Sequence, residues 1–126
     1  MKAEILPFSP DTEFYIEERC YIVEYSNSDN DPDLSIAQAR VEPCVTTAWH
    51  RLQGVTERYV IISGTGRVEV GDLDPRDVSY GDTVIIPPNV RQRITNTSDS
   101  EDLIFLALCT PRFDDAIYES LEDKDE

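Results

Sequence analysis

Short runs of β-branched and aromatic residues recur along this chain at nearly regular intervals, and turn-forming residues such as glycine, proline, asparagine and aspartate separate them. Two examples are Glu57 to Ser63 and Leu103 to Cys109, the second of which is apolar on both faces. After the first run, Gly64-Thr65-Gly66 can take the positive φ angles of a tight hairpin that returns through Arg67 to Val70. The pattern predicts an all-β sandwich or barrel rather than alternating βαβ units.

Further strands are expected wherever the same composition recurs. They are Ala3 to Leu6, one or two strands within Glu13 to Tyr25, Leu34 to Val41, Thr46 to Leu52, Thr83 to Pro87 and Arg91 to Asn96. The segments Asn27 to Asp33 and Gly71 to Asp82 are rich in turn-forming residues, so both are predicted to be loops.

The chain changes character after Pro111. Asp114 to Leu121 begins with two acidic residues, which favour the N-terminus of a helix, and it places Ile117, Tyr118 and Leu121 at helical spacing. A short C-terminal helix is therefore predicted, with its apolar side on the barrel or on a partner subunit. It belongs to an acidic tail, about residues 114–126, whose last five residues are expected to be disordered.

The length of 126 residues fits one domain, here expected to span residues 1–126. Acidic side chains number 26 against 11 basic ones, and the formal net charge of -15 repels phosphate backbones and anionic lipids. Neither a nucleic-acid partner nor a membrane partner is therefore expected. The first residues lack the apolar core of a secretory signal, so a cytoplasmic location is expected. Cys20, Cys44 and Cys109 are too few and too widely spaced for a disulfide framework.

Two groups of residues have the spacing of a known pair of motifs. The first group is His50, Leu52, Glu57 and Gly64, and the second is Gly81, Pro87, Asn89, Gln92 and Asn96. Their order and spacing resemble the two motifs of the cupins, which read H-x-H with a later E and G, and then G-x5-P-x-G-x2-H-x3-N. The resemblance implies a cupin jelly-roll barrel, also called a double-stranded β-helix, with the functional site in its interior.

The resemblance also implies a metal site. In the cupin pattern, two histidines and the glutamate of the first motif hold a divalent metal together with the histidine of the second. This sequence has Leu52 and Gln92 at two of those four positions, and leucine cannot coordinate a metal. A reduced ligand set is therefore predicted, namely His50, Glu57 and Gln92, which would suit Mn, Fe, Ni or Zn at lower affinity than a three-histidine site.

Alternation along the strands adds a lining to this interior site, because residues two apart on a strand point the same way. The residues two positions beyond the three predicted ligands are Leu52, Tyr59 and Ile94, and we expect them to line a ligand pocket. Trp49 and Arg51 alternate with the histidine and are expected to point outward.

Two functions fit these residues. The first is a metal-dependent enzyme of the oxygenase, isomerase or lyase type that acts on a small organic molecule. The second is a metal-free barrel that binds a small-molecule ligand or serves structure alone, in which Glu57 and Gln92 are hydrogen-bonding groups and Glu57 can pair with His50 or an inward arginine. A homodimer through exposed strands or the tail is also expected.

Overall fold

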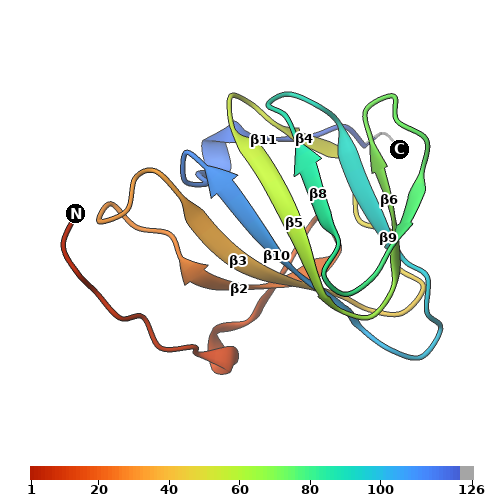
Figure 1. The fold of residues 1–126 in the computed structure, drawn as a ribbon, viewed down its shortest axis with the longest axis horizontal. Coiled ribbons are helices and arrows are strands. Elements are labelled where there is room, and N and C mark those ends of the chain that lie inside the picture. The colour runs from red at the N-terminus through yellow and green to blue at the C-terminus, as the bar shows by residue number, and fades with distance from the viewer. Residues whose placement is uncertain (123–126) are drawn as a thin grey trace.

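The computed structural model describes residues 1–122, and within this range the chain forms eleven β-strands and two short 3-10 turns (Figure 1). The strands are β1 (Phe14–Ile16), β2 (Cys20–Ser26), β3 (Ser35–Val41), β4 (His50–Leu52), β5 (Thr56–Ser63), β6 (Gly66–Val70), β7 (Arg76–Val78), β8 (Thr83–Ile86), β9 (Gln92–Asn96), β10 (Leu103–Thr110) and β11 (Tyr118–Ser120). The 3-10 turns are η1 (Pro10–Thr12) and η2 (Asp115–Ile117). No helix in the described range is long or apolar enough to cross a membrane.

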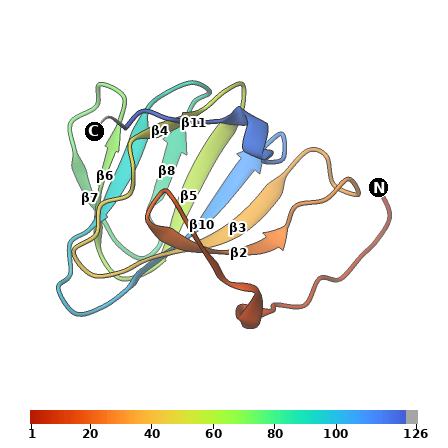
Figure 2. The same cartoon turned by 180° about the vertical axis from the view of Figure 1, so that it is seen from behind.

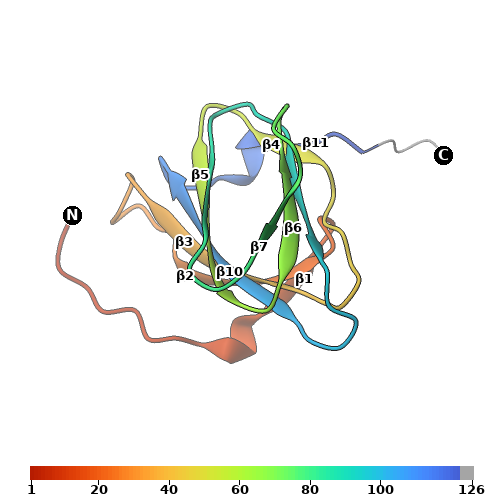
Figure 3. The ribbon, with the colours of Figure 1, turned by 45° about the vertical axis from the view of Figure 1, so that its right-hand side comes forward.

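The strands form two antiparallel sheets that enclose an interior between them (Figure 2, Figure 3). One sheet has six strands in the order β1-β2-β3-β10-β5-β8, and the other has five in the order β11-β4-β9-β6-β7. Neighbours in both sheets come from distant parts of the chain, as with β3 beside β10 and β4 beside β9. The predicted all-β fold is confirmed, and the topology is that of a jelly-roll barrel.

Alternation along each strand sorts side chains between the interior and the surface of the barrel. On β5 and β9 the inward residues are buried; they are Glu57, Tyr59 and Ile61, and Gln92, Ile94 and Asn96. At one end of the barrel, Ile61, Ile94 and Leu103 meet in a close-packed core and have no exposed surface. The core thus anchors the same strands that carry the predicted site residues.

The hairpin predicted at Gly64-Thr65-Gly66 is wrong, because this turn joins β5 of one sheet to β6 of the other and the two strands do not pair. Gly64 has a φ angle of +86°, and a Cβ atom there would lie 2.5 Å from the backbone oxygen of Asp102. Both observations require glycine, because other residues are strained at this φ and a backbone oxygen cannot be approached so closely. The turn therefore carries the chain from one sheet into the other.

Two predictions about secondary structure are wrong in the outer parts of the chain. Ala3 to Leu6 forms no strand, and residues 1–9 instead run as an extended segment away from the barrel (Figure 2). Gly71 to Asp82 is not wholly a loop, because β7 lies within it and pairs with β6. Strand β7 is a short edge strand with charged residues, so it lacks the apolar alternation that marks the other strands.

The predicted C-terminal helix is also wrong. Asp114 to Leu121 contains the 3-10 turn η2 and then strand β11, which pairs antiparallel with β4. The acidic start acts as a cap, because the Asp114 side chain accepts a hydrogen bond from the Ala116 amide. The open edge of β4 decides the rest, since strand pairing satisfies backbone groups there. Residues 123–126 of the predicted acidic tail lie outside the described residues.

Candidate functional site

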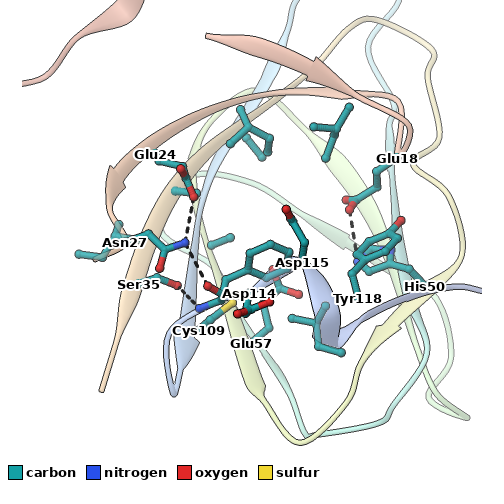
Figure 4. A pocket seen from close by; sticks show the side chains of 18 of the residues that line it. Glu18, Glu24, Asn27, Ser35, His50, Glu57, Cys109, Asp114, Asp115 and Tyr118 are labelled. Atoms are coloured by element: carbon teal, nitrogen blue, oxygen red, sulfur yellow. Dashed lines mark hydrogen bonds and ion pairs between the residues drawn. The ribbon is translucent and has the colours of Figure 1, made fainter. Parts of the chain in front are cut away.

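A cavity of about 800 Å³ occupies the barrel interior beside the close-packed core (Figure 4). Its walls come from β1, β2, β3, β5 and β10 of the six-stranded sheet and from β4 and β11 of the other. The β1–β2 turn and the segment before β11 border it. Aromatic and aliphatic side chains alternate in its lining with carboxylates and with the histidine of the chain.

His50 is held in one orientation at the wall of this cavity. Strand β4 pairs with both β9 and β11, and only 2% of the histidine surface is exposed. The Nδ1 atom lies 2.7 Å from the backbone oxygen of Ala48, and because a carbonyl only accepts, Nδ1 carries a proton. The ring of Tyr118 stacks on the imidazole with 5.2 Å between ring centroids. The Nε2 atom is therefore the one that remains for chemistry.

A glutamate that the sequence did not reveal lies opposite this nitrogen. Glu18 sits in the β1–β2 turn, and its Oε1 atom is 3.7 Å from His50 Nε2 (Figure 4). The backbone oxygen of Glu18 accepts a hydrogen bond from the Ala48 amide, which holds the turn beside the histidine. Only 14% of the Glu18 side chain is exposed. This burial raises the pKa of Glu18, and the charge of His50 offsets part of that rise. The flanking Glu17 and Arg19 are typical of a solvated turn, so no sequence signal marked this residue.

Glu57 is joined to Gln92 and Tyr59 by a chain of hydrogen bonds. The Gln92 amide nitrogen donates to Glu57 Oε1 at 2.8 Å, and the Tyr59 hydroxyl donates to Gln92 Oε1. Burial raises the pKa of Glu57 to about 7, with a further rise from the charge of Glu18, while His50 and the Gln92 hydrogen bond act in the opposite direction. Burial thus brings the pKa of this carboxyl group from its usual acidic range toward neutral pH.

The predicted pocket residues differ in where they lie. Leu52 and Tyr59 line the cavity. Ile94 does not, because it is fully buried in the core, two residues beyond Gln92 on β9. The cavity therefore ends near Gln92, and the rest of β9 belongs to the core.

The three predicted metal ligands lie close together, and one of them, Gln92, is already engaged by its neighbours. His50 and Gln92 pair directly across β4 and β9, and Gln92 contacts Glu57. Both polar atoms of the Gln92 side chain are engaged by neighbours, however, and the side chain is fully buried behind the cavity wall. Within residues 1–122 no three His, Cys, Asp or Glu side chains converge as metal ligands. Binding of Mn, Fe, Ni or Zn by this set stays a prediction.

Trp49 and Arg51 lie outside the cavity, on the other side of β4 from His50. The guanidinium groups of Arg91 and Arg93 lie over the Trp49 ring, at 4.8 and 4.3 Å from its centroid. Arg51 Nε lies 2.9 Å from a Glu119 carboxylate oxygen across β4 and β11. These contacts fix the outer side of β4 and so support the position of the histidine on its inner side.

A family model described as the cupin domain matches residues 38–109. The chain belongs to the cupin family. Both motifs found in the sequence lie within the matched range, so the resemblance stated from them is confirmed. No curated protein matches this cupin in sequence.

Several solved structures share the architecture of this cupin. KdgF from Halomonas sp. has a TM-score of 0.76 at 17% identity, over 91% of this chain and 99% of that one. An uncharacterized conserved protein with a double-stranded β-helix domain from Klebsiella pneumoniae has a TM-score of 0.75 at 19% identity, over 95% and 100% of the two chains. Pac13 of Streptomyces, a nucleoside dehydratase, has a TM-score of 0.75 at 14% identity, over 97% and 92%. At these identities the similarity shows the fold, and it confirms the predicted double-stranded β-helix.

Proposed function

We propose that this cupin is an enzyme of the isomerase or lyase type, which moves protons within a small organic molecule bound in the cavity and uses no resident metal. The observation that carries the proposal is the meeting of three ionisable side chains, Glu18, His50 and Glu57, in one cavity of about 800 Å³. Groups held in different protonation states within one pocket are what general acid–base catalysis requires. The cavity volume suits a small-molecule substrate.

In this proposal His50 supplies the base. In the neutral ring the proton on Nδ1 leaves the lone pair on Nε2, at the cavity wall. The 3.7 Å between Nε2 and Glu18 is longer than a hydrogen bond, so a substrate proton can approach the lone pair. Once Nε2 has taken a proton, the imidazolium forms an ion pair with Glu18, which stabilises the charge.

Glu57 supplies the acid. Its Oε1 atom accepts from the Gln92 amide, so the proton of its neutral form resides on Oε2. With a pKa of about 7, Glu57 is present in both forms at neutral pH and can donate as well as accept a proton. Gln92 is a positioning residue in this scheme, because the Tyr59 hydroxyl holds its oxygen and so keeps its nitrogen turned toward Glu57.

These roles balance as an elimination of water. His50 Nε2 removes a proton from carbon, the electron pair of that C–H bond forms the C=C bond, and the C–O bond to a hydroxyl group breaks as Glu57 protonates the leaving oxygen. A proton shift between neighbouring carbons would use the same two groups with no leaving group. The existence of a nucleoside dehydratase, Pac13, on a barrel of the same fold supports the elimination.

Charge in and around the cavity favours an uncharged or cationic substrate. Besides the two inner glutamates, the carboxylates that line it are Glu17, Glu24, Asp114 and Asp115. The one arginine in the lining, Arg112, is already paired with Asp29 at 2.7 Å. A carboxylate or phosphate substrate would therefore enter against a negative potential.

The test is turnover of a panel of uncharged probes in D2O, namely β-hydroxyaldehydes, β-hydroxyketones and uridine, followed by proton NMR. We expect deuterium exchange or loss of water with chelator-treated wild type, and a fall in rate of about 100-fold or more in His50→Ala and in Glu57→Gln. Arg67→Ala, which changes an exposed charge on β6, should keep the wild-type rate. Turnover that survives both site substitutions would refute the proposal.

Elemental analysis tests the metal-dependent alternative. Wild type and His50→Ala are compared as isolated and after incubation with Mn, Fe, Ni and Zn. Stoichiometric metal that the variant loses, together with activity that requires it, would overturn the metal-independent mechanism. Turnover by protein that contains substoichiometric metal would support the metal-independent mechanism. Thermal stabilisation by a probe, with no deuterium exchange on any probe, would instead indicate a barrel that binds small molecules without catalysis.

A further inference from the structure

The ring of Tyr118 is placed on the wall of the cavity by the pairing of β11 with β4. Tyr118 lies opposite Leu52 in the register of the two strands, and paired residues on neighbouring strands point to the same face. His50 stands two residues before Leu52 on β4, so it shares this face. The two rings meet on it, with 5.2 Å between centroids and 18° between planes (Figure 4). The tyrosine therefore lies beside the base of the proposed reaction.

The Tyr118 hydroxyl is a hydrogen-bond donor that the described part of the chain leaves free. No group within residues 1–122 accepts a hydrogen bond from it, although every fully buried polar atom of a side chain in this range has a partner. The hydroxyl is therefore accessible, and Tyr118 is one of the residues that line the cavity. Burial and the charge of Glu18 raise the pKa of Tyr118, so its hydroxyl carries a proton at neutral pH.

The other O–H and N–H donors around the histidine are already used. The Nδ1 proton of His50 is directed to a backbone oxygen, and the Tyr59 hydroxyl donates to Gln92. The Gln92 amide in turn donates to Glu57 and has no exposed surface. In the proposed elimination, the one proton of neutral Glu57 goes to the leaving oxygen. Tyr118 is thus the donor that remains for another atom of the substrate.

The chemistry of proton removal from carbon requires such a donor. Imidazole is too weak a base for an ordinary C–H bond, and it removes the proton only where the electron pair can move onto a neighbouring carbonyl oxygen. That oxygen then develops negative charge, which the carboxylates of Glu18 and Glu57 in the same cavity oppose. A fixed hydrogen-bond donor at the developing charge is the usual means of stabilising it. The free hydroxyl beside His50 can supply this hydrogen bond.

We infer that the substrate of this cavity is an uncharged β-hydroxy aldehyde or ketone, and that Tyr118 is a further catalytic residue whose hydroxyl donates a hydrogen bond to the carbonyl oxygen. The inference rests on the proposed function and names its substrate class. First, His50 Nε2 takes the proton of the carbon between the carbonyl and the hydroxyl-bearing carbon, and the electron pair moves onto the carbonyl oxygen. The pair then returns to form the C=C bond, the C–O bond to the hydroxyl group breaks, and Glu57 protonates the leaving oxygen, which departs as water. Tyr118 keeps its proton throughout.

The charge of the cavity separates aldehydes and ketones from acids. Carboxylates line the cavity, and the one arginine in the lining, Arg112, is paired with Asp29. A β-hydroxy acid already carries one negative charge and would develop a second on proton removal. One hydrogen bond from Tyr118 is too weak to offset two charges at a negative potential. An aldehyde or ketone begins neutral and develops a single charge, at the oxygen that Tyr118 holds.

Tyr118→Phe tests the role of the hydroxyl, because it removes one oxygen and keeps the ring that stacks on His50. With a β-hydroxyketone in D2O, we expect the rate of deuterium exchange beside the carbonyl to fall by about 100-fold or more, as on the loss of other oxyanion donors. The midpoint of thermal unfolding should stay unchanged. Tyr80→Phe makes the same change at a residue that is 78% exposed and should keep the wild-type rate. A Tyr118→Phe rate equal to that of the wild type would overturn the role of the hydroxyl.

Matched probes test the substrate class. They are a β-hydroxyketone, the diol made by reducing its carbonyl group, and the β-hydroxy acid of the same chain length. We expect exchange and loss of water with the ketone alone, because the diol has no carbonyl oxygen to take up charge and the acid enters against a negative potential. Turnover of the diol or the acid as fast as that of the ketone would overturn the assigned class.

Infrared difference spectroscopy separates this inference from the proposed function, because it needs no turnover. The probe is cyclohexanone with an isotope label at the carbonyl carbon, which has no β-hydroxyl group and cannot eliminate water. A hydrogen bond lowers the C=O stretching frequency, so the bound label should absorb at a lower frequency in the wild type than in Tyr118→Phe. That difference, without turnover of any probe, would refute the elimination and support the carbonyl site. Equal frequencies, or no bound ketone at saturating concentration, would overturn the placement of Tyr118 against a carbonyl oxygen.

Discussion

The two ends of the barrel interior are built by the same strands, yet one end is a close-packed apolar core and the other is an open polar cavity. On β5, Ile61 is fully buried in the close-packed core, whereas Glu57, four residues earlier, faces the cavity. On β9, Ile94 belongs to the core and Gln92 stands at the boundary. A step of two to four residues, about 7 to 14 Å along a strand, changes the interior from apolar and filled to polar and open.

Because of this difference, the core end stabilises the fold and the cavity end carries the ionisable groups. Burial of aliphatic surface at the core end is favourable, at about 25 cal/mol per Å². Burial of Glu18 and Glu57 at the cavity end is unfavourable to their charged forms, which is why the pKa of each is raised. Truncating a side chain at the core end should therefore destabilise the fold, while neutralising one at the cavity end should stabilise it at neutral pH.

The largest effect is expected at the core end. Ile61→Ala should lower the free energy of unfolding by about 2 to 5 kcal/mol, because it removes buried methyl groups and leaves a cavity among packed neighbours. Urea unfolding followed by circular dichroism measures the change. Leu73→Ala, at a residue that is 72% exposed, is the control and should change the value by less than about 0.5 kcal/mol. A loss under about 1 kcal/mol at Ile61 would mean that the two ends are packed alike.

The second effect is a pH dependence at the cavity end. The pKa of Glu57 rises from 4.5 to about 7 on folding, so the folded chain binds this proton more tightly than the unfolded chain. The resulting stabilisation is present in full below about pH 4.5 and is lost as the pH rises through about 7. We expect Glu57→Gln to match the wild type near pH 4 and to exceed it at pH 8, by at most about 3 kcal/mol.

Unfolding free energies of both proteins across this pH range test the sign. The glutamine can still accept the hydrogen bond from Gln92, so the comparison isolates the charge. Asp77→Asn is a useful control, because it neutralises a carboxylate that is paired with Arg67 at the surface. If the free energies of unfolding of wild type and Glu57→Gln differ more at low pH than at high pH, the conclusion that folding raises the pKa of Glu57 is wrong.

The third effect is at the boundary between the two ends. Gln92→Leu leaves the hydrogen-bonding groups of Glu57 and Tyr59 without their buried partner, at a cost of about 1 to 3 kcal/mol. It should also raise the pKa of Glu57 further, since the lost hydrogen bond acts to lower it. Unfolding at pH 5 and NMR titration of the Glu57 carboxyl measure the two changes. Gln53→Leu, in an exposed loop, should produce neither.

The strands and motifs of the barrel were legible in the sequence because they depend on local patterns. Alternation placed Glu57 and Tyr59 on one face of β5, and motif spacing brought His50 and Gln92 to neighbouring strands. The pattern also showed, at Leu52, that the metal-ligand set is incomplete. These features need only the period of a strand and the order of the residues.

The remaining features depend on contacts between distant segments. Glu18 points toward the histidine because the turn passes through Arg19 at a φ of 74° and is held by Ala48, and neither is visible in the local sequence. Strand β11 replaces the predicted helix because β4 offers an open edge. The use of Gln92 as a hydrogen-bonding bridge depends on the orientation of Tyr59, from another strand. Tertiary pairing decided each of these points against local propensity.

The smallest effect is expected at the border of the cavity. Asp114→Ala removes the hydrogen bond that the Ala116 amide donates at 2.8 Å, and should cost about 0.5 to 1 kcal/mol. The turn η2 leads directly into Tyr118, which stacks on His50, so amide exchange of Ala116 and Ile117 should quicken more than global unfolding does. Asp115→Ala changes the same charge in the same turn and has no such capping bond, so its exchange should stay at the wild-type rate. If the two substitutions quicken amide exchange equally, the negative charge rather than the capping hydrogen bond stabilises the turn. The border of the cavity would then depend on electrostatics, as the cavity does, and not on packing, as the core does.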